Sequence, residues 1–312
     1  MVEQSETRPL VTFALFHYNQ EALVADAMAA ALAQDYTPLE VIVSDDCSTD
    51  GTWDAIQKVA ADYDGPHALR IVRNDSNMGI GPHVGRVGLM ARGELIVQAD
   101  GDDLSAPNRV SRMVEAWMAN GKTEGVLHSD ARMPGKVSND KPDPEKSNLE
   151  YFVKNQFRGM FYGSVAAYTR DVFRRFPPLS SGFEDVALNF RALLIGRVIY
   201  VDEVLVDYNL SEVSVSHPIR MWQRDRGERW FNSIYRNIEG MEADYIHHLK
   251  SEGLQPDARI VQQLNAVKRK INIGRGILSY NPVRIARGMS VYPYGVTFRQ
   301  WFGFYRTFFG LR

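Results

Sequence analysis

Four short apolar runs, each followed by a segment with helical spacing, make up the first third of the chain. The runs occupy residues 10–16, 39–44, 69–73 and 94–99, and their length and β-prone residues are typical of buried strands. Strands that alternate with helices in this way predict an α/β fold with a mostly parallel, doubly wound sheet and helices on both faces.

Local signals refine the helices of this region. Asn19 is expected to cap a helix that runs to residue 33. Pro107 suits the first turn of a later helix, which Gly121 ends. The loops that follow the strands then meet at the carboxyl edge of the sheet, where open α/β folds bind their ligands.

The second half of the chain carries a different pattern. Residues 161–169 and 198–206 are predicted strands that flank a helix over 185–194, and the proline-containing stretch 133–148 is typical of a loop. From residue 218 onward, aromatic and aliphatic residues recur at helical spacing, and a second long helix is expected over 256–278. We therefore expect an α/β domain over residues 1–217 and a helical C-terminal extension over 218–312.

Composition narrows the class of protein. The chain has 312 residues, a formal net charge of −2 and one cysteine, Cys47. This charge speaks against a basic nucleic-acid-binding surface, and a single cysteine excludes an intrachain disulfide. Residues 1–9 are polar, and no run approaches the roughly 18 apolar residues of a membrane span. We expect a cytoplasmic protein without a nucleic-acid partner.

The most informative stretch is Asp100-Gly101-Asp102-Asp103, which directly follows the predicted strand over 94–99. Clustered carboxylates repel one another and are costly to desolvate, so an ordered cluster usually needs a cation. A hard ion such as Mg²⁺ or Mn²⁺ takes one or two protein carboxylates and fills its shell with phosphate oxygens. A solvated acidic turn is the alternative reading.

Two further acidic pairs stand at the ends of predicted elements. Asp45-Asp46 ends the second strand, and Glu184-Asp185 begins the helix over 185–194. Each pair also has a structural reading: Asp favours capping turns, and acids at a helix start complement its dipole.

With their flanking residues these acids resemble the family 2 glycosyltransferases, inverting enzymes of the GT-A fold, over residues 11–217. The segments that carry the resemblance are Phe16-His17-Tyr18-Asn19, Val41 to Thr52, Asn77-Met78-Gly79, Ala91 to Asp103 and Phe183-Glu184-Asp185.

The resemblance implies a role for each of these segments. Asp102, helped by Asp100, would hold a metal that bridges the diphosphate of a nucleotide-sugar donor. Asp185, or its neighbour Glu184, would be the general base. Tyr18 and its turn would pack on the nucleotide base, and Asp45 or Asp46 would accept a hydrogen bond from the base or ribose. The implied nucleotide-sugar-binding set is Phe16, Tyr18, Asn19, Asp45, Asp46, Asn77, Arg86, Asp100 and Gly101.

Two positions depart from the family pattern. Val84-Gly85 stand where the family often has an Arg-Asn pair, and Arg86, one residue on, is a candidate substitute contact to phosphate. The family often has an Arg and a His after the tyrosine of the late strand, but Asn209 and Leu210 follow Tyr208 here. His217 is a candidate third metal ligand or phosphate contact, and a helix cap or surface residue is the alternative.

The resemblance implies transfer of a sugar from a UDP, dTDP or GDP donor to a hydroxyl of a glycan or lipid-linked saccharide. A nucleotidyltransferase of related fold is one alternative, but residues 16–20 lack the Gly-rich basic loop that it needs. A non-catalytic scaffold that binds nucleotide-sugar is the other. The aromatic, arginine-containing tail over 298–312 either lies in the inner face of the plasma membrane, as a peripheral contact, or packs on the catalytic domain or a second copy in a homo-oligomer.

Overall fold

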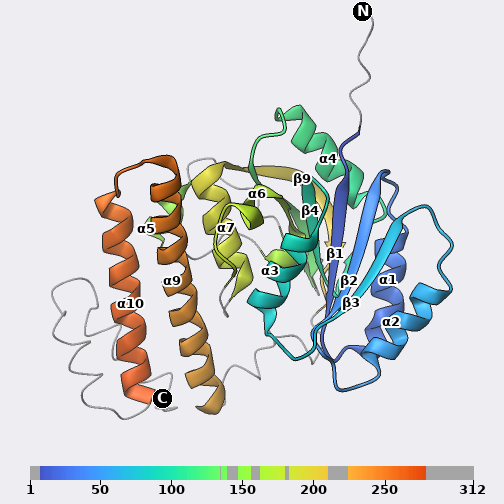
Figure 1. Ribbon diagram of the computed structural model, residues 1–312, viewed down its shortest axis with the longest axis horizontal. Coiled ribbons are helices and arrows are strands. Elements are labelled where there is room, and N and C mark those ends of the chain that lie inside the picture. Colours follow the sequence, from blue (N-terminus) through green and yellow to red (C-terminus); the bar gives the residue numbers. More distant parts are fainter. Residues whose placement is uncertain are drawn as a thin grey trace, which may run out of the picture.

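The structure, a computed structural model, describes residues 8–133, 135–138, 147–155, 162–179, 183–209 and 224–278. A sheet with helices on both faces forms the larger part (Figure 1). Two long C-terminal helices, α9 and α10, stand beside each other at one end, far from the α1 and α2 end.

One nine-stranded sheet runs through the described part of the chain, in the order β3-β2-β1-β4-β8-β6-β9-β5, with β7 paired to β6. The strands are β1 (Val11–His17), β2 (Leu39–Asp45), β3 (Ala68–Arg73), β4 (Leu95–Asp100), β5 (Leu104–Ser105), β6 (Gly125–Met133), β7 (Lys136–Val137), β8 (Ala166–Thr169) and β9 (Arg197–Asp207).

The first four strands form the parallel half of the sheet, as the sequence predicts. β1 pairs in parallel with β2 and β4, and β2 pairs in parallel with β3. Every residue of β1 and β2 is buried, because helices cover both sides. All four strands run the same way, so their carboxyl ends meet at one edge.

The other half of the sheet is mixed. β8 runs antiparallel to both β4 and β6, β6 pairs in parallel with β9, and β5 runs antiparallel to β9. The sequence did not predict β6, because polar residues such as His128, Ser129 and Asp130 interrupt its apolar run. The strand expected over 161–169 is shorter, since a 3-10 turn, η3 (Gly163–Val165), precedes β8.

Helices cover the two faces of the sheet and bury a separate apolar core on each. On one face Met28, Ile56 and Trp117 join the first core, and on the other Val87, Phe173 and Leu188 join the second. The helices of the α/β part are η1 (Glu21–Leu23), α1 (Val24–Leu32), α2 (Thr52–Ala61), α3 (Ile80–Met90), α4 (Arg109–Ala119), α5 (Leu149–Lys154), α6 (Asp171–Arg174) and α7 (Glu184–Ile195).

The C-terminal extension consists, in its described part, of α9 (Arg224–Glu252) and α10 (Ala258–Leu278). These two helices share a third apolar core with α5 and α7, which includes Phe190, Tyr245 and Leu264. The predicted helical extension is therefore present, and it packs directly on α7. Within the described residues no helix is long and apolar enough to cross a membrane.

Two local helix predictions are wrong. Asn19 caps no helix: its backbone is left-handed (φ 52°) and its side-chain oxygen accepts from the backbone of Thr49 (2.8 Å). Pro107 lies outside the helix, because α4 begins at Arg109 with Asn108 as its N-cap. Gly121 does follow the end of α4, in the left-handed conformation (φ 69°) that glycine adopts without strain.

Candidate functional site

The acidic cluster lies at the carboxyl end of β4. Asp100 is the last residue of that strand, and the turn after it brings Asp102 and Asp103 alongside. One carboxylate oxygen from each residue lies within 4.8 Å of the other two. The backbone N–H of Asp103 donates to the carbonyl of Asp100 (3.1 Å) and closes the turn. The structure thus brings together the three acids that the sequence singled out.

Burial and mutual repulsion disfavour the charged forms of this cluster. Burial raises the pKa of Asp103 to about 7, and the backbone N–H of Asn209, which donates to its carboxylate (2.8 Å), opposes that rise. Burial and the neighbouring charges of Asp103 and Glu184 raise the pKa of Asp100 well above its ordinary value. A bound cation would offset this repulsion, so the electrostatics of the cluster favour cation binding.

The donor set fits a hard divalent cation. Three carboxylates offer only oxygen atoms, which Mg²⁺ and Mn²⁺ prefer over the nitrogen and sulfur ligands of zinc sites. Asp100 and Asp102 are half-buried while Asp103 is buried, which leaves the first two accessible to a ligand.

Arg109, the first residue of α4, is a fully buried cation that no motif in the sequence indicates. Its guanidinium donates to the carbonyl of Gln98 (2.8 Å) and to the hydroxyl of Ser105 (2.9 Å). Burial lowers the pKa of Arg109 to about 10, and the charges of Asp103 and Asp100 counteract that fall. Arg109 therefore supplies a fixed positive charge near the acidic cluster.

The pair Glu184-Asp185 opens α7 and faces the same cluster. The amide of Gln98, on β4, approaches the carboxylate of Glu184 (3.4 Å), and the carboxylate of Asp185 accepts from the backbone of Val186 (2.7 Å). Burial, followed by the charge of Asp185, raises the pKa of Glu184 to about 8. Burial also raises the pKa of Asp185. The expected base candidates and metal candidates therefore share one electrostatic environment.

The other predicted acidic pair makes several hydrogen bonds within the protein. Asp46 accepts from the side chain of Asn74 (2.7 Å) and from the backbone of Met78 and Gly79 (both 2.9 Å). Asp45 accepts from the backbone of Ser48 (3.1 Å) and pairs with Arg73 (3.2 Å). These contacts fix the loops after β2 and β3 at the same edge of the sheet.

The turn after β1 presents an aromatic side chain. Tyr18 is 45% exposed, whereas Phe16 is buried and meets the ring of His83 edge-on at 5.2 Å between centroids. The hydroxyl oxygens of Ser48 and Thr52 accept from the backbone of Asn19 (2.9 Å) and Gln20 (2.8 Å). The turn is therefore hydrogen-bonded to the loop after β2, and the backbone that carries the exposed Tyr18 ring is held in place.

The remaining predicted residues fall in different surroundings. Asn77 is exposed, and the guanidinium of Arg86 donates to the side chain of Asn74. Gly101 is buried, and a Cβ there would lie 2.2 Å from Nδ1 of His17, so a larger residue would force the turn or His17 to shift. His217 and the aromatic tail lie outside the described residues.

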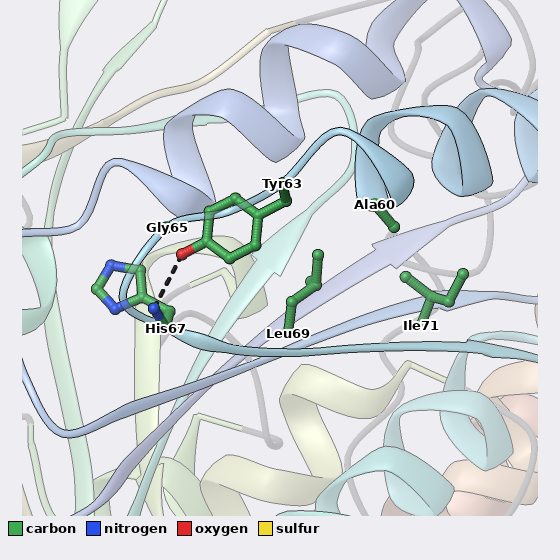
Figure 2. A pocket seen from close by; sticks show the side chains of 6 residues that line it. All are labelled: Ala60, Tyr63, Gly65, His67, Leu69 and Ile71. Atoms are coloured by element: carbon green, nitrogen blue, oxygen red, sulfur yellow. Dashed lines mark hydrogen bonds between the residues drawn. The ribbon is translucent and has the colours of Figure 1, made fainter.

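A separate hollow of about 310 Å³ lies between α2 and the edge strand β3 (Figure 2). Its lining comprises Ala60, Tyr63, Gly65, His67, Leu69 and Ile71, and the hydroxyl of Tyr63 accepts from the backbone of His67 (2.9 Å). None of the predicted site residues lines it, so it plays no part in the acidic centre.

Comparison with known proteins identifies the group to which this arrangement belongs. The model of the family described as Glycosyl transferase family 2 matches residues 13–176. The putative colanic acid biosynthesis glycosyl transferase WcaA of Escherichia coli (strain K12) is 32% identical over 158 residues, which are 50% of this chain and 54% of that protein. The chain thus spans about half the length of this relative.

Two solved structures share the fold. TarS 1-349 of S. aureus in complex with UDP-GlcNAc superposes with a TM-score of 0.56 at 17% identity, covering 90% of this chain and 88% of that one. The mannosyltransferase PcManGT from Pyrobaculum calidifontis, in complex with GDP-Man and Mn²⁺, gives 0.56 at 21% identity, covering 94% and 77%. These matches confirm the predicted GT-A fold.

Proposed function

Because the chain belongs to Glycosyl transferase family 2, we propose that it transfers one sugar from a nucleoside diphosphate sugar to a hydroxyl group of a saccharide. The observation that carries the proposal is the convergence of Asp100, Asp102 and Asp103 with Glu184 and Asp185 at one edge of the sheet. TarS with UDP-GlcNAc and PcManGT with GDP-Man support a nucleotide-sugar as the donor substrate.

Asp102 and Asp100 are the proposed metal ligands, and Asp103 completes the carboxylate cluster. A bound Mn²⁺ or Mg²⁺ stabilises, as a Lewis acid, the negative charge that develops on the leaving diphosphate. The Mn²⁺ of PcManGT supports this assignment. Arg109 adds a fixed positive charge, which lowers the cost of holding the three carboxylates close together.

Asp185 is the proposed general base, with Glu184 as the alternative. The oxygen of the acceptor hydroxyl attacks the anomeric carbon, its proton passes to the carboxylate, and the bond from that carbon to the diphosphate oxygen breaks. The nucleoside diphosphate leaves on the opposite side, so the anomeric configuration inverts. Proton removal in the transition state is worth roughly 10²–10⁴-fold in rate.

The nucleotide is proposed to lie against the Tyr18 ring, near the loops after β2 and β3. Asp45 or Asp46 contacts the base or ribose, and both acids also hold these loops in place through Ser48 and the Met78–Gly79 turn. Asn77 and Arg86 border the same edge of the sheet, where Arg86 is the proposed contact to phosphate.

The proposed acceptor is a glycan or a lipid-linked saccharide, which the colanic acid relative supports. A lipid-linked acceptor accords with peripheral contact of the protein at the inner face of the plasma membrane, through the tail over 298–312. Packing of that tail in a homo-oligomer is the competing proposal.

A thermal-shift panel of UDP, GDP, dTDP and CMP, each with Mn²⁺, Mg²⁺ or chelator, tests the sugar-donor site. Ligand at about 100 times its Kd adds roughly 2.7 kcal/mol to the free energy of unfolding. We expect one nucleoside diphosphate to raise the Tm with metal and to lose that effect with chelator. Asp102→Asn removes the shift, whereas Asp62→Asn, on the exposed end of α2, retains it.

Absence of a shift with every nucleotide would favour the non-catalytic scaffold. The nucleotidyltransferase alternative predicts a different result: a nucleoside triphosphate and a sugar 1-phosphate would yield pyrophosphate. Release of pyrophosphate, with no turnover of any nucleotide-sugar, would replace the glycosyltransferase proposal.

A further inference from the structure

An aromatic pair lies beside the acidic centre and has no role in the chemistry described so far. The rings of Tyr162 and Tyr208 are 5.7 Å apart between centroids and inclined by 36°. Tyr162 is 46% exposed, while Tyr208 packs against the second apolar core. One ring of the pair is therefore largely exposed, and it contacts a second ring that is packed on the core.

The pair is connected to both halves of the acidic centre by its neighbours in the chain. Gly163, next to Tyr162, approaches Glu184 so closely that a Cβ there would lie 3.0 Å from the carboxylate and 2.5 Å from the Gln98 amide. Asn209, next to Tyr208, donates its backbone N–H to the carboxylate of Asp103 (2.8 Å). The segments that carry the two tyrosines therefore contact both a base candidate, Glu184, and a member of the acidic cluster, Asp103.

Hydrogen bonds hold the backbone of each tyrosine in place. The carbonyl of Tyr162 accepts from Val165 (3.3 Å) as η3 begins, and the N–H of Tyr208 donates to the carbonyl of Arg132 on β6 (2.8 Å). A side chain fixed at its backbone loses less conformational entropy when a ligand covers it.

An aromatic ring beside carboxylates complements a sugar, which has an apolar face and a rim of hydroxyl groups. One face of a pyranose carries axial C–H bonds and packs on an aromatic ring, and its rim of hydroxyls donates to carboxylate oxygens. Tyr162 directly precedes Gly163, whose backbone lies against Glu184, so the exposed ring belongs to the segment beside the proposed base.

We propose that Tyr162, supported by Tyr208, is the platform on which the pyranose ring of the acceptor saccharide stacks so that its hydroxyl reaches the Glu184-Asp185 pair. This inference rests on the proposed function. It names the acceptor ring as the ligand of a surface distinct from the nucleotide turn, and it makes Tyr162 a specificity-determining residue.

Saturation-transfer NMR tests the platform with methyl glycosides of glucose, galactose, mannose and N-acetylglucosamine as probes. The full chain is used, with Mn²⁺ and the nucleoside diphosphate that the thermal-shift panel selects. We expect at least one glycoside to receive saturation through its ring C–H protons. Tyr162→Ala reduces its affinity by about tenfold, the loss expected for one aromatic contact. Tyr162→Phe and Tyr162→Trp keep the ring and retain binding.

The thermal shift with nucleoside diphosphate and Mn²⁺, measured on each variant, separates this inference from the proposed function. An unchanged shift in Tyr162→Ala together with lost glycoside binding supports the platform. No saturation transfer to any glycoside, equal transfer in Tyr162→Ala, or loss of the nucleotide shift in that variant overturns it. Wild-type protein that shows no nucleotide shift but binds a glycoside through Tyr162 would refute the proposed function, and Tyr162 would remain a sugar-binding surface without an acceptor role.

Discussion

Arg191 of α7 and Asp244 of α9 form a bidentate ion pair that is closed to solvent. Its two hydrogen bonds measure 2.7 and 2.8 Å, and each side chain is only 3% exposed. The same guanidinium donates to the carbonyl of Pro177 (2.7 Å), which lies shortly before Glu184 in the chain. One side chain therefore links the C-terminal extension to the helix that begins with the base candidates.

Removal of one partner of this pair should destabilise the protein strongly. Asp244→Ala leaves the Arg191 charge buried without its partner, and we expect a loss of about 3–5 kcal/mol in the free energy of unfolding, measured by urea denaturation. The matched control is Glu252→Ala, which breaks the exposed pair of Glu252 with Arg175 and should cost less than about 1 kcal/mol. Equal losses in the two variants would mean that the buried pair has no special role.

Asp185→Asn should separate chemistry from nucleotide binding. The amide cannot accept the acceptor proton, so we expect turnover to fall by roughly 10²–10⁴-fold. The metal-dependent thermal shift should remain, because the variant keeps all three acids of the β4 cluster. Release of nucleoside diphosphate from the nucleotide-sugar measures turnover, and Asp26→Asn, on the exposed side of α1, serves as control. Near-wild-type turnover of Asp185→Asn would indicate that Glu184, and not Asp185, is the general base.

Glu184→Gln should change how stability depends on pH in metal-free protein. The pKa of Glu184 is raised to about 8, so the folded protein keeps a proton that the unfolded chain loses above its ordinary pKa of 4.5. The stabilisation is therefore complete below the unfolded pKa and is lost as the pH rises through 8. Relative to Glu184→Gln, the wild type should lose about 1.4 kcal/mol for each pH unit across this window.

Urea unfolding in chelator, at about pH 5 and about pH 8.5, measures that difference. Glu239→Gln, at an exposed position of α9, should follow the wild type at both pH values. A Glu184→Gln curve parallel to the wild type would show that the carboxyl titrates normally.

Gly101→Ala should disturb the junction between the acidic turn and the end of β1. The added Cβ would lie 2.2 Å from Nδ1 of His17 and 2.5 Å from Oε1 of Gln20, so the turn must shift. We expect a loss of about 1–3 kcal/mol in stability and a weaker metal-dependent nucleotide shift. Gly121→Ala, where nothing lies within 4 Å but φ is +69°, isolates the backbone cost alone. A full nucleotide-dependent thermal shift in Gly101→Ala would show that nucleotide binding does not depend on the packing of the acidic turn against the end of β1.

The parallel half of the sheet could be predicted because its information is local. Apolar runs specify β1, β2 and β4, and the acids at their ends fall at a common edge as a matter of topology. The sequence therefore led directly to the cluster around Asp102, and to Asp185 at the start of the next predicted helix.

Distant contacts explain what local patterns missed. Asn19 has a capping side chain, but a contact with Thr49, 30 residues away, takes its oxygen. β6 carries His128 and Asp130 within a buried strand, so its periodicity is broken. The Gln98–Glu184 contact spans 86 residues, and the burial of Arg109 depends on the carbonyl of Ala166 as well as that of Gln98. No local pattern encodes such pairings.

The hydrogen bond from Asn209 to Asp103 determines when, during synthesis of the polypeptide, the acidic centre can be completed. These residues are 106 positions apart, so Asp103 leaves the ribosome long before its partner is synthesised. N-terminal segments generally fold first during synthesis, and β1 to β4 have all their parallel partners by then. The nascent chain therefore completes the parallel half of its sheet first, and the acidic centre stays incomplete until β9 and Asn209 are added.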